Sequence, residues 1–314
     1  MCSLLLTKDI KYKLKDKYMS LSIKYGYTPD KEAIARHLEL IASNLDKVAS
    51  EKVYKECFAI MDLTTLANED TPESVAALTK KVNSFEKDYP SYPLPASICV
   101  YPNLGHVVAS LRSNPDVHVT TVAGCFPTSQ SFLEVKLHEI ELAVRGGADE
   151  IDIVLALNSF LAGDLETAGA EILASRGCID RVAAELGRPV VLKVILETGL
   201  LVTPELIAEA SFLAMENGAD FIKTSTGKVK VNATPQAAYV MCQCIKKYFE
   251  ATGKKVGFKA AGGISSALDA VCYYSIVSTV LGQEWLNKNL FRFGVSRLAN
   301  QILSAVEQKT VVYF

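Results

Sequence analysis

The sequence predicts a protein of the α/β class, and within that class a (β/α)8 TIM barrel with an N-terminal helical extension. From about residue 56 onward, short apolar and β-branched stretches alternate with longer segments of helical periodicity, and there are eight such stretches. Strand–helix alternation implies a parallel sheet with right-handed crossovers, and eight units fit a barrel of about 250 residues. An open doubly wound sheet usually has a glycine-rich turn after its first strand, whereas here the strand leads into Asp62-Leu-Thr-Thr-Leu66.

The expected strands are short and rich in Val, Ile, Leu and Phe. In chain order they are Phe58–Leu63, Ser97–Tyr101, Val117–Ala123, Glu150–Leu155, Val190–Leu196, Phe221–Thr224, Val256–Ala260 and Phe291–Gly294. Helical segments between them include Glu73–Phe85, Leu133–Arg145, Leu165–Leu186, Pro204–Glu216, Pro235–Phe249 and Ser266–Ser278. Thr203-Pro204-Glu205 is a start signal for one of these helices, and Asn217-Gly218 marks its end.

We expect three parts along the chain: residues 1–54 as the helical extension, 55–307 as the barrel and 308–314 as a C-terminal tail. Asp30–Ser50 has apolar residues at spacings of three and four, which predicts an amphipathic helix. Lys8–Tyr27 is compatible with a docked helix or a mobile arm. The tail is compatible with a frayed end or with a segment that folds over the open face of the barrel.

Composition excludes several classes of protein. Of the 314 residues 49% are hydrophobic and the net charge is -2, which excludes disorder and argues against a nucleic-acid binder held by bulk electrostatics. No apolar run approaches the roughly 20 residues of a membrane span. Residues 1–6 lack a basic segment of the signal-peptide type, so we expect a cytosolic protein. The eight cysteines include no C-x-x-C pair and the four histidines have no ligand spacing, so we expect neither a disulfide scaffold nor a metal site.

Charged residues interrupt five of the strands, although parallel barrel strands should be nearly continuous apolar runs. They are Asp62, Asp152, Lys193, Lys223 and Lys259. Successive side chains of a strand point to opposite faces. Because Phe258 suits the layer beneath the helices, Lys259 should point into the barrel, and Ile151 and Ile153 assign Asp152 to the interior in the same way. We therefore expect all five charges inside the barrel.

One interpretation of these charges is a purely structural salt-bridge network, but unpaired buried ions are costly. Two features favour chemistry instead. The charges lie near the C-terminal ends of strands, where barrel active sites are found. Three lysines face two aspartates, so one ammonium is under pressure to lose its proton, and a neutral lysine is a nucleophile. A reactive lysine in a barrel without metal ligands suggests Schiff-base chemistry.

Over roughly residues 55 to 300 the sequence resembles the deoxyribose-phosphate aldolase family. The matching motifs are Met61-Asp-Leu-Thr-Thr65, Ile98-Cys-Val-Tyr-Pro102, Ala148-Asp-Glu-Ile-Asp-Ile-Val154, Leu192-Lys-Val-Ile-Leu-Glu-Thr-Gly199, Phe221-Ile-Lys-Thr-Ser-Thr-Gly-Lys228, Val231-Asn-Ala-Thr-Pro235, Gly257-Phe-Lys-Ala-Ala-Gly-Gly263 and Arg292-Phe-Gly294. The resemblance implies a class I aldolase that needs no metal or cofactor. Such an enzyme cleaves 2-deoxy-D-ribose 5-phosphate reversibly to acetaldehyde and D-glyceraldehyde 3-phosphate.

The resemblance also implies roles for individual residues. Lys223 is the expected Schiff-base lysine, with Asp152 and Lys259 as the proton-transfer pair. Lys193 is either part of that chemistry or only an electrostatic partner of Asp152, and Asp62 is expected to order the lysines. Some members of the family end in a tyrosine that reaches the site, whereas here Tyr313 is the penultimate residue.

A phosphate group would be bound by backbone amides and helix N-termini, which in barrels follow the last strands. The candidates are Gly227 and Lys228 after strand six, Gly262 and Gly263 after strand seven, and Gly294 and Ser296 after strand eight. Arg297 departs from the family pattern, which commonly has a second serine there. We thus expect a small phosphosugar as the partner, with no nucleic acid or membrane, and a homo-oligomer is compatible with the sequence. The alternatives are another lysine aldolase, for example a transaldolase-like enzyme, and an inactive barrel that acts as a scaffold.

Overall fold

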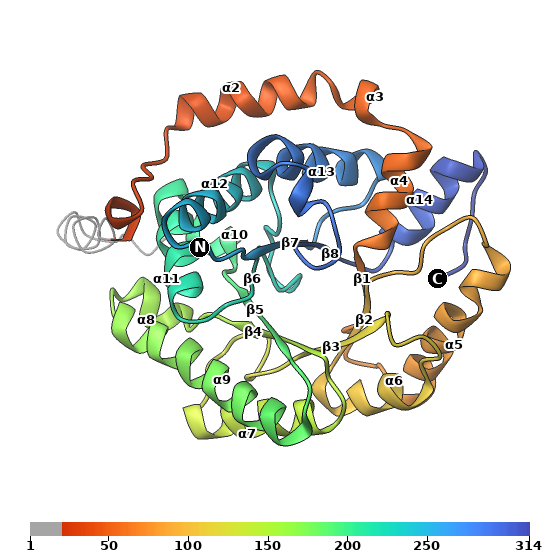
Figure 1. Cartoon of the computed structure of the whole chain (residues 1–314), viewed down its shortest axis with the longest axis horizontal. Helices are drawn as coiled ribbons and strands as arrows, with labels where there is room; N and C mark the ends of the chain where they lie inside the picture. Colours follow the sequence, from red (N-terminus) through yellow and green to blue (C-terminus); the bar gives the residue numbers. More distant parts are fainter. Residues whose placement is uncertain (1–20) are drawn as a thin grey trace.

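The computed structural model describes residues 21–314, which form a closed barrel of eight parallel strands surrounded by helices (Figure 1). The strands pair in chain order, and β8 closes the barrel by pairing with β1. They are β1 (Met61–Thr64), β2 (Ser97–Val100), β3 (His118–Val122), β4 (Glu150–Val154), β5 (Val191–Ile195), β6 (Phe221–Lys223), β7 (Gly257–Ala261) and β8 (Phe291–Val295). The predicted (β/α)8 barrel is therefore confirmed.

The main helices of the barrel layer are α5 (Pro72–Asp88), α6 (Gly105–Leu111), α7 (Leu133–Arg145), α9 (Leu165–Leu186), α11 (Pro204–Glu216), α12 (Pro235–Thr252), α13 (Ala267–Leu281) and α14 (Leu298–Glu307). The shorter α8 (Leu157–Leu161) and α10 (Thr198–Leu201) follow β4 and β5. Three helices begin in the same way: Thr71, Thr203 and Thr234 each cap the helix with a side-chain oxygen, and a proline follows in the first helical position.

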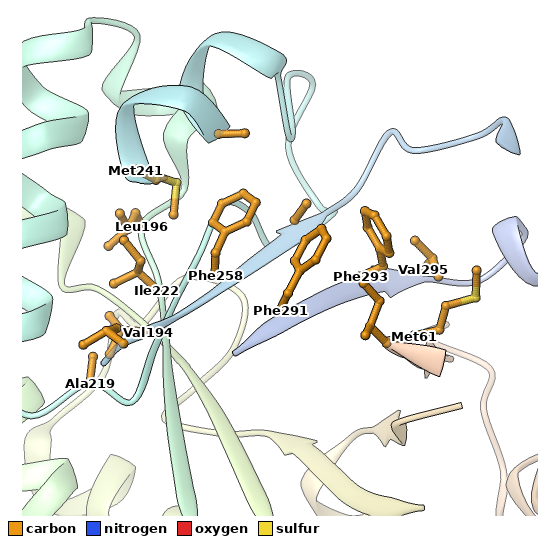
Figure 2. Close-up of a cluster of buried hydrophobic side chains, with 14 of the residues drawn as sticks. Met61, Val194, Leu196, Ala219, Ile222, Met241, Phe258, Phe291, Phe293 and Val295 are labelled. Atoms are coloured by element: carbon orange, nitrogen blue, oxygen red, sulfur yellow. The ribbon is translucent and has the colours of Figure 1, made fainter. Parts of the chain in front are cut away.

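Apolar side chains fill the layer between the strands and the helices. Figure 2 shows the rings of Phe258, Phe291 and Phe293 on one side of their strands, the side on which Met241 of α12 lies. All of these side chains are fully buried. Because neighbouring residues of a strand alternate in direction, this outer layer leaves Lys259 and Arg292 to the barrel interior.

The first predicted strand is wrong at its N-terminal end. Phe58 belongs to α4 (Glu51–Ala59), and β1 begins only at Met61. A short apolar run has the same appearance at the end of a buried helix as in a buried strand, so periodicity alone did not separate the two. The helix α4 also crosses the expected limit between residues 54 and 55.

The long helix predicted over Asp30–Ser50 is two helices, α2 (Lys31–Ala42) and α3 (Leu45–Val48). Asp30 caps α2 as expected, because its side chain accepts hydrogen bonds from the amides of residues 32 and 33. The break follows from two side chains that compete for the helix backbone: Ser43 Oγ and Asn44 Nδ2 both donate to the carbonyl of Leu40, at 2.9 and 2.8 Å.

The extension is anchored to the barrel by a buried carboxylate. Glu209 of α11 accepts hydrogen bonds from the amides of Leu21 and Ser22 and from the Ser22 hydroxyl, at 2.9, 3.0 and 2.8 Å. Tyr25 stacks on Phe212 of the same helix with ring centroids 4.7 Å apart. From there α2, α3 and α4 lie against α12 and α13 (Figure 1).

Two expectations for the N-terminus fall partly or wholly on residues 1–20, outside the described residues. They are the missing signal peptide at residues 1–6 and the docked helix or mobile arm over Lys8–Tyr27. Within residues 21–314, no helix combines the length and apolar character that crossing a membrane requires.

The C-terminal tail is neither a frayed end nor a cover for the open face of the barrel, so both expectations are wrong. The Asn300 side chain of α14 accepts hydrogen bonds from the amides of Tyr313 and Phe314, both at 3.0 Å, and donates to the Phe314 carbonyl at 2.7 Å. The Tyr313 hydroxyl donates to Asp88 of α5 at 2.7 Å, and its ring packs on Phe85. The tail thus lies against the outer helices α5 and α14.

This arrangement predicts that Asn300 holds the tail. Asn300→Ala removes three hydrogen bonds and should lower the free energy of unfolding by about 1–3 kcal/mol. Urea unfolding measures that loss, and carboxypeptidase digestion should release the last residues faster. Gln301→Ala, at the exposed neighbouring position, is the matched control. Equal unfolding midpoints and digestion rates for the two variants would contradict the assignment.

Candidate active site

The barrel interior of residues 21–314 holds a cluster of seven buried charged side chains. They are Asp62 of β1, Glu150 and Asp152 of β4, Lys193 of β5, Lys223 of β6, Lys259 of β7 and Arg292 of β8. The structure brings together all five charges that strand parity assigned to the interior. Glu150 and Arg292 were missed, although the same parity applies: Glu150 precedes Asp152 by two residues, and Arg292 alternates with Phe291 and Phe293.

Asp152 is the centre of the cluster, because its two carboxylate oxygens accept hydrogen bonds from three lysines. Oδ2 receives Lys223 Nζ and Lys259 Nζ, each at 2.8 Å, and Oδ1 receives Lys193 Nζ at 2.8 Å. The sheet register explains why these four side chains lie together. Asp152 pairs with Lys193 across β4 and β5, and Lys223 pairs with Lys259 across β6 and β7.

Asp62 is a second carboxylate that contacts these lysines. Its Oδ2 lies 2.5 Å from Lys259 Nζ and 3.9 Å from Lys193 Nζ, as ion pairs without hydrogen-bond geometry. Its Oδ1 accepts a hydrogen bond from Arg292 at 2.5 Å. Asp62 thus contacts Lys259 and Lys193 directly, whereas Lys223 forms its ion pair with Asp152.

The three lysines differ in their pKa. Burial lowers the pKa of Lys223, and the nearby Lys259 ammonium lowers it further against the opposing pull of Asp152. Burial also opposes the charge on Lys259 and Lys193, but the carboxylates around each outweigh it and raise both pKa values. The pKa of Asp152 lies well below its ordinary value, because its lysine partners outweigh the effect of burial. Lys223 is therefore the lysine of this cluster that loses its proton most readily.

The turns that follow β7 and β8 are adjacent, because Ala261 pairs with Gly294 across these strands. Gly262 and Gly263 both have positive φ, 78° and 77°, which favours glycine. A side chain at Gly294 would come within 3.0 Å of the Lys259 side chain, so glycine leaves Lys259 its path into the interior. Beyond these turns, α13 is capped by Ser266, and α14 follows Ser296 and Arg297.

The loop after β6 crosses to the loop after β1. Gly227 has a positive φ of 81°, and the next residue, Lys228, donates from Nζ to the Leu66 carbonyl at 2.5 Å. Because β7 and β8 lie between β6 and β1 in the closed barrel, Lys228 lies on the same side of the barrel mouth as the glycine turns of these two strands, and its ammonium has a backbone partner. Among residues 21–314, no group of three or more His, Cys, Asp or Glu side chains is arranged to hold a metal ion.

Comparisons with known proteins agree with this architecture. The family model described as DeoC/LacD family aldolase matches residues 57–272. A putative deoxyribose-phosphate aldolase of Caenorhabditis elegans is 40% identical over 282 residues, which is 88% of this chain and 89% of the relative. The deoxyribose-phosphate aldolase of Agrobacterium fabrum is 38% identical over 249 residues, 79% of this chain and 89% of the relative.

Solved structures show the same fold. The crystal structure of a putative deoxyribose-phosphate aldolase from Toxoplasma gondii has a TM-score of 0.68 at 20% identity and covers 82% of this chain and 95% of its own. A tetrameric deoxyribose phosphate aldolase from Aeropyrum pernix has a TM-score of 0.63 at 23% identity and covers 88% and 98%. At such identities, the likeness to these two structures shows the fold alone.

The shared oxygen of Asp152 predicts what happens when Lys259 is removed. Lys259→Leu deletes a neighbouring cation and leaves Oδ2 to Lys223, so the Lys223 ammonium is better stabilised and its pKa rises. Reductive methylation with formaldehyde and cyanoborohydride, followed at Lys223 by peptide mass spectrometry, should show half-maximal reactivity at a higher pH. The control is Lys247→Leu, which removes a partly exposed lysine of α12 that pairs with Glu250 away from the barrel interior. An unchanged midpoint in Lys259→Leu would mean that Lys259 does not influence Lys223.

Proposed function

Because this chain belongs to the DeoC/LacD family of aldolases, we propose that it cleaves 2-deoxy-D-ribose 5-phosphate reversibly to D-glyceraldehyde 3-phosphate and acetaldehyde through a lysine Schiff base. The observation that carries the proposal is Lys223, a buried lysine with a lowered pKa, 2.8 Å from Asp152 and beside a second lysine. The names of its relatives support the substrate, and their family makes the protein a lyase.

The reaction begins at Lys223. With its proton lost, the Nζ lone pair attacks the aldehyde carbon of the open-chain sugar, and loss of water leaves a protonated imine. The imine is an electron sink for the carbon–carbon bond that breaks. Asp152, directly or through a water molecule, accepts the proton of the 3-hydroxyl, D-glyceraldehyde 3-phosphate leaves, and an enamine remains on Lys223.

The second half returns the enzyme to its starting state. The enamine carbon receives a proton, and water hydrolyses the resulting imine to acetaldehyde and free Lys223. Lys259 suits the proton transfer because it shares Asp152 Oδ2 with Lys223 and keeps its own proton through the carboxylates of Asp152 and Asp62. Asp62 and Lys193 act through these residues: Asp62 orients Lys259, and Lys193 holds the other oxygen of Asp152.

The substrate phosphate would bind where the turns of β7 and β8 adjoin. Gly262, Gly263, Gly294 and Ser296 would supply backbone amides and a hydroxyl near the starts of α13 and α14, and the Gly262 amide would exchange its long hydrogen bond to the Gly294 carbonyl, 3.4 Å, for the phosphate. Gly227 gives the β6 loop its turn, and Lys228 would exchange its backbone partner Leu66 for the phosphate.

The remaining expectations complete the proposal. The aldolase domain is residues 55–307, with residues 1–54 as its extension and 308–314 as its tail. The partner is a small phosphosugar in the catabolism of deoxyribose phosphates, with neither nucleic acid nor membrane, and no metal or cofactor takes part. The protein is a cytosolic enzyme, and the tetrameric relative supports a homo-oligomer.

Trapping tests the Schiff base. Incubation with 2-deoxy-D-ribose 5-phosphate and borohydride, in the presence of EDTA, should give one covalent adduct, and peptide mass spectrometry should place it on Lys223. Lys223→Ala should abolish both the adduct and cleavage, because no other lysine of the cluster has a lowered pKa. Lys247→Ala is the control. An adduct on Lys259 or Lys193 would refute the assignment, and loss of activity in EDTA would refute a metal-independent reaction.

The phosphate site has its own test. Lys228→Gln should lower kcat/KM for 2-deoxy-D-ribose 5-phosphate roughly 10- to 100-fold, the effect of one charge-assisted hydrogen bond of about 1.5–3 kcal/mol. Activity on unphosphorylated 2-deoxy-D-ribose should stay the same. Lys230→Gln, an exposed lysine of the same loop, is the matched control. Equal losses on both substrates would place Lys228 outside the phosphate site.

A further inference from the structure

Glu150 and Arg292 form a fully buried ion pair that the proposed reaction does not use. Arg292 Nη2 donates to Glu150 Oε1 at 2.6 Å, and Nη1 donates to Oε2 at 3.1 Å, so the guanidinium engages both carboxylate oxygens. The Arg292 side chain is 2% exposed and the Glu150 side chain 1%. Because Glu150 precedes Asp152 by two residues on β4, the pair lies one layer nearer the N-terminal ends of the strands.

Two series of contacts connect the pair to Lys259 and to Asp152. Arg292 Nη1 also donates to Asp62 Oδ1 at 2.5 Å, and Asp62 contacts Lys259. Glu150 Oε2 lies 2.6 Å from Lys193 Nζ, and Lys193 donates to Asp152. The cation of the pair thus holds an anion of the cluster, and the anion of the pair holds a cation.

Other contacts fix the pair in place from the N-terminal side of the barrel. Thr120 donates to Glu150 Oε2 at 2.8 Å, and His118 Nδ1 lies 2.7 Å from Oε1. Arg292 Nε donates to the Lys288 carbonyl. A pair held on all sides does not reorient, which is the property expected of groups that position others.

We propose that Glu150 and Arg292 are positioning residues for the Schiff-base lysine: they fix Lys193 and Asp62, and their opposite charges set how readily Lys223 gives up its proton. The proposal rests on the function proposed above. It predicts opposite effects from removing the two partners, which a purely structural pair would not produce.

Removing the anion should favour neutral Lys223. In Glu150→Gln, Lys193 loses one carboxylate and is drawn fully to Asp152, so Asp152 has less negative charge to offer Lys223. The interior also gains one net positive charge. Both changes disfavour the Lys223 ammonium.

Removing the cation, Arg292, should favour the protonated form of Lys223. In Arg292→Met, Asp62 is left with the lysines as its only cations, and the interior loses one positive charge, so the Lys223 ammonium becomes more stable. The groups that influence Lys223 directly are Asp152, Lys259, Cys99 and Glu197, and neither substitution removes any of them.

The experiment follows imine formation in the full-length chain. Acetaldehyde and cyanoborohydride trap the imine at Lys223, and the trapping rate is measured against pH. The acid limb of this profile should move to lower pH in Glu150→Gln and to higher pH in Arg292→Met, each by about one to two pH units for a charge some ångströms away. The double variant Glu150→Gln/Arg292→Met should return towards the wild-type position, because its net charge is restored.

Two further variants control for disruption of the fold. Arg292→Lys keeps the positive charge and should leave the limb near its wild-type position. Glu209→Gln removes a buried carboxylate that contacts the extension instead of the cluster, and should leave the limb unchanged. If circular dichroism shows that the single variants do not fold, the test uses the double variant and Arg292→Lys. An acid limb that is displaced from its wild-type position equally in both would overturn the proposal.

The proposal would also be overturned if the acid limbs of folded Glu150→Gln and Arg292→Met moved in the same direction or did not move. Failure of the proposed function is a separate result, because it appears as the absence of a Lys223 adduct in the wild-type chain.

Discussion

The carboxylate of Asp152, which accepts hydrogen bonds from three lysines in the buried interior of the barrel, is the constraint on which this site depends. The cluster contains four cations and three anions when every group is charged. A buried charge without a partner is costly, so the deficit of one anion falls on the cation that is held least. Lys193 and Lys259 each contact at least two carboxylates, whereas Lys223 has only Asp152 within 4.0 Å among the described residues. Burial lowers the pKa of Lys223, and the single carboxylate of Asp152 does not offset this effect, so the pKa stays below its ordinary value.

The same imbalance bears on the chemistry after the first bond forms. The neutral amine leaves the cluster with three charges of each sign, and the protonated imine restores the excess cation. The enamine nitrogen is neutral, and the excess charge leaves the cluster once the proton that Asp152 accepts from the 3-hydroxyl has passed to water. An interior that disfavours the extra positive charge therefore favours the conversion of the protonated imine to the enamine together with release of that proton. In the proposed reaction, one electrostatic feature both frees the nucleophile and assists carbon–carbon cleavage.

Strand parity found five of the seven interior charges from the sequence, because a side chain's face in a strand depends only on its neighbours. Glu150 and Arg292 obey the same rule, but Glu150 is the first residue of its strand, and Arg292 stands alone between two phenylalanines. The local sequence pattern was least informative for residues whose hydrogen-bond partners are distant in the sequence. Tyr313 bonds to Asp88, 225 residues away, and the Asn300 side chain that holds the tail has no signature of its own. The boundary of α4 was missed because an apolar run does not distinguish a helix end from a strand.

The packing of α13 has a consequence for how copies of this protein can associate. Its sequence is apolar around most of the helix, with buried residues toward the barrel and toward the extension, and Tyr274 donates to Glu56 of α4 at 2.5 Å. A barrel of this kind without α2, α3 and α4 would leave an apolar surface over α12 and α13, the type of surface that a second subunit covers. Here the chain covers that surface with its own N-terminal helices. A second copy that approached this side of the barrel would meet the outer surface of α2, α3 and α4 instead of α12 and α13.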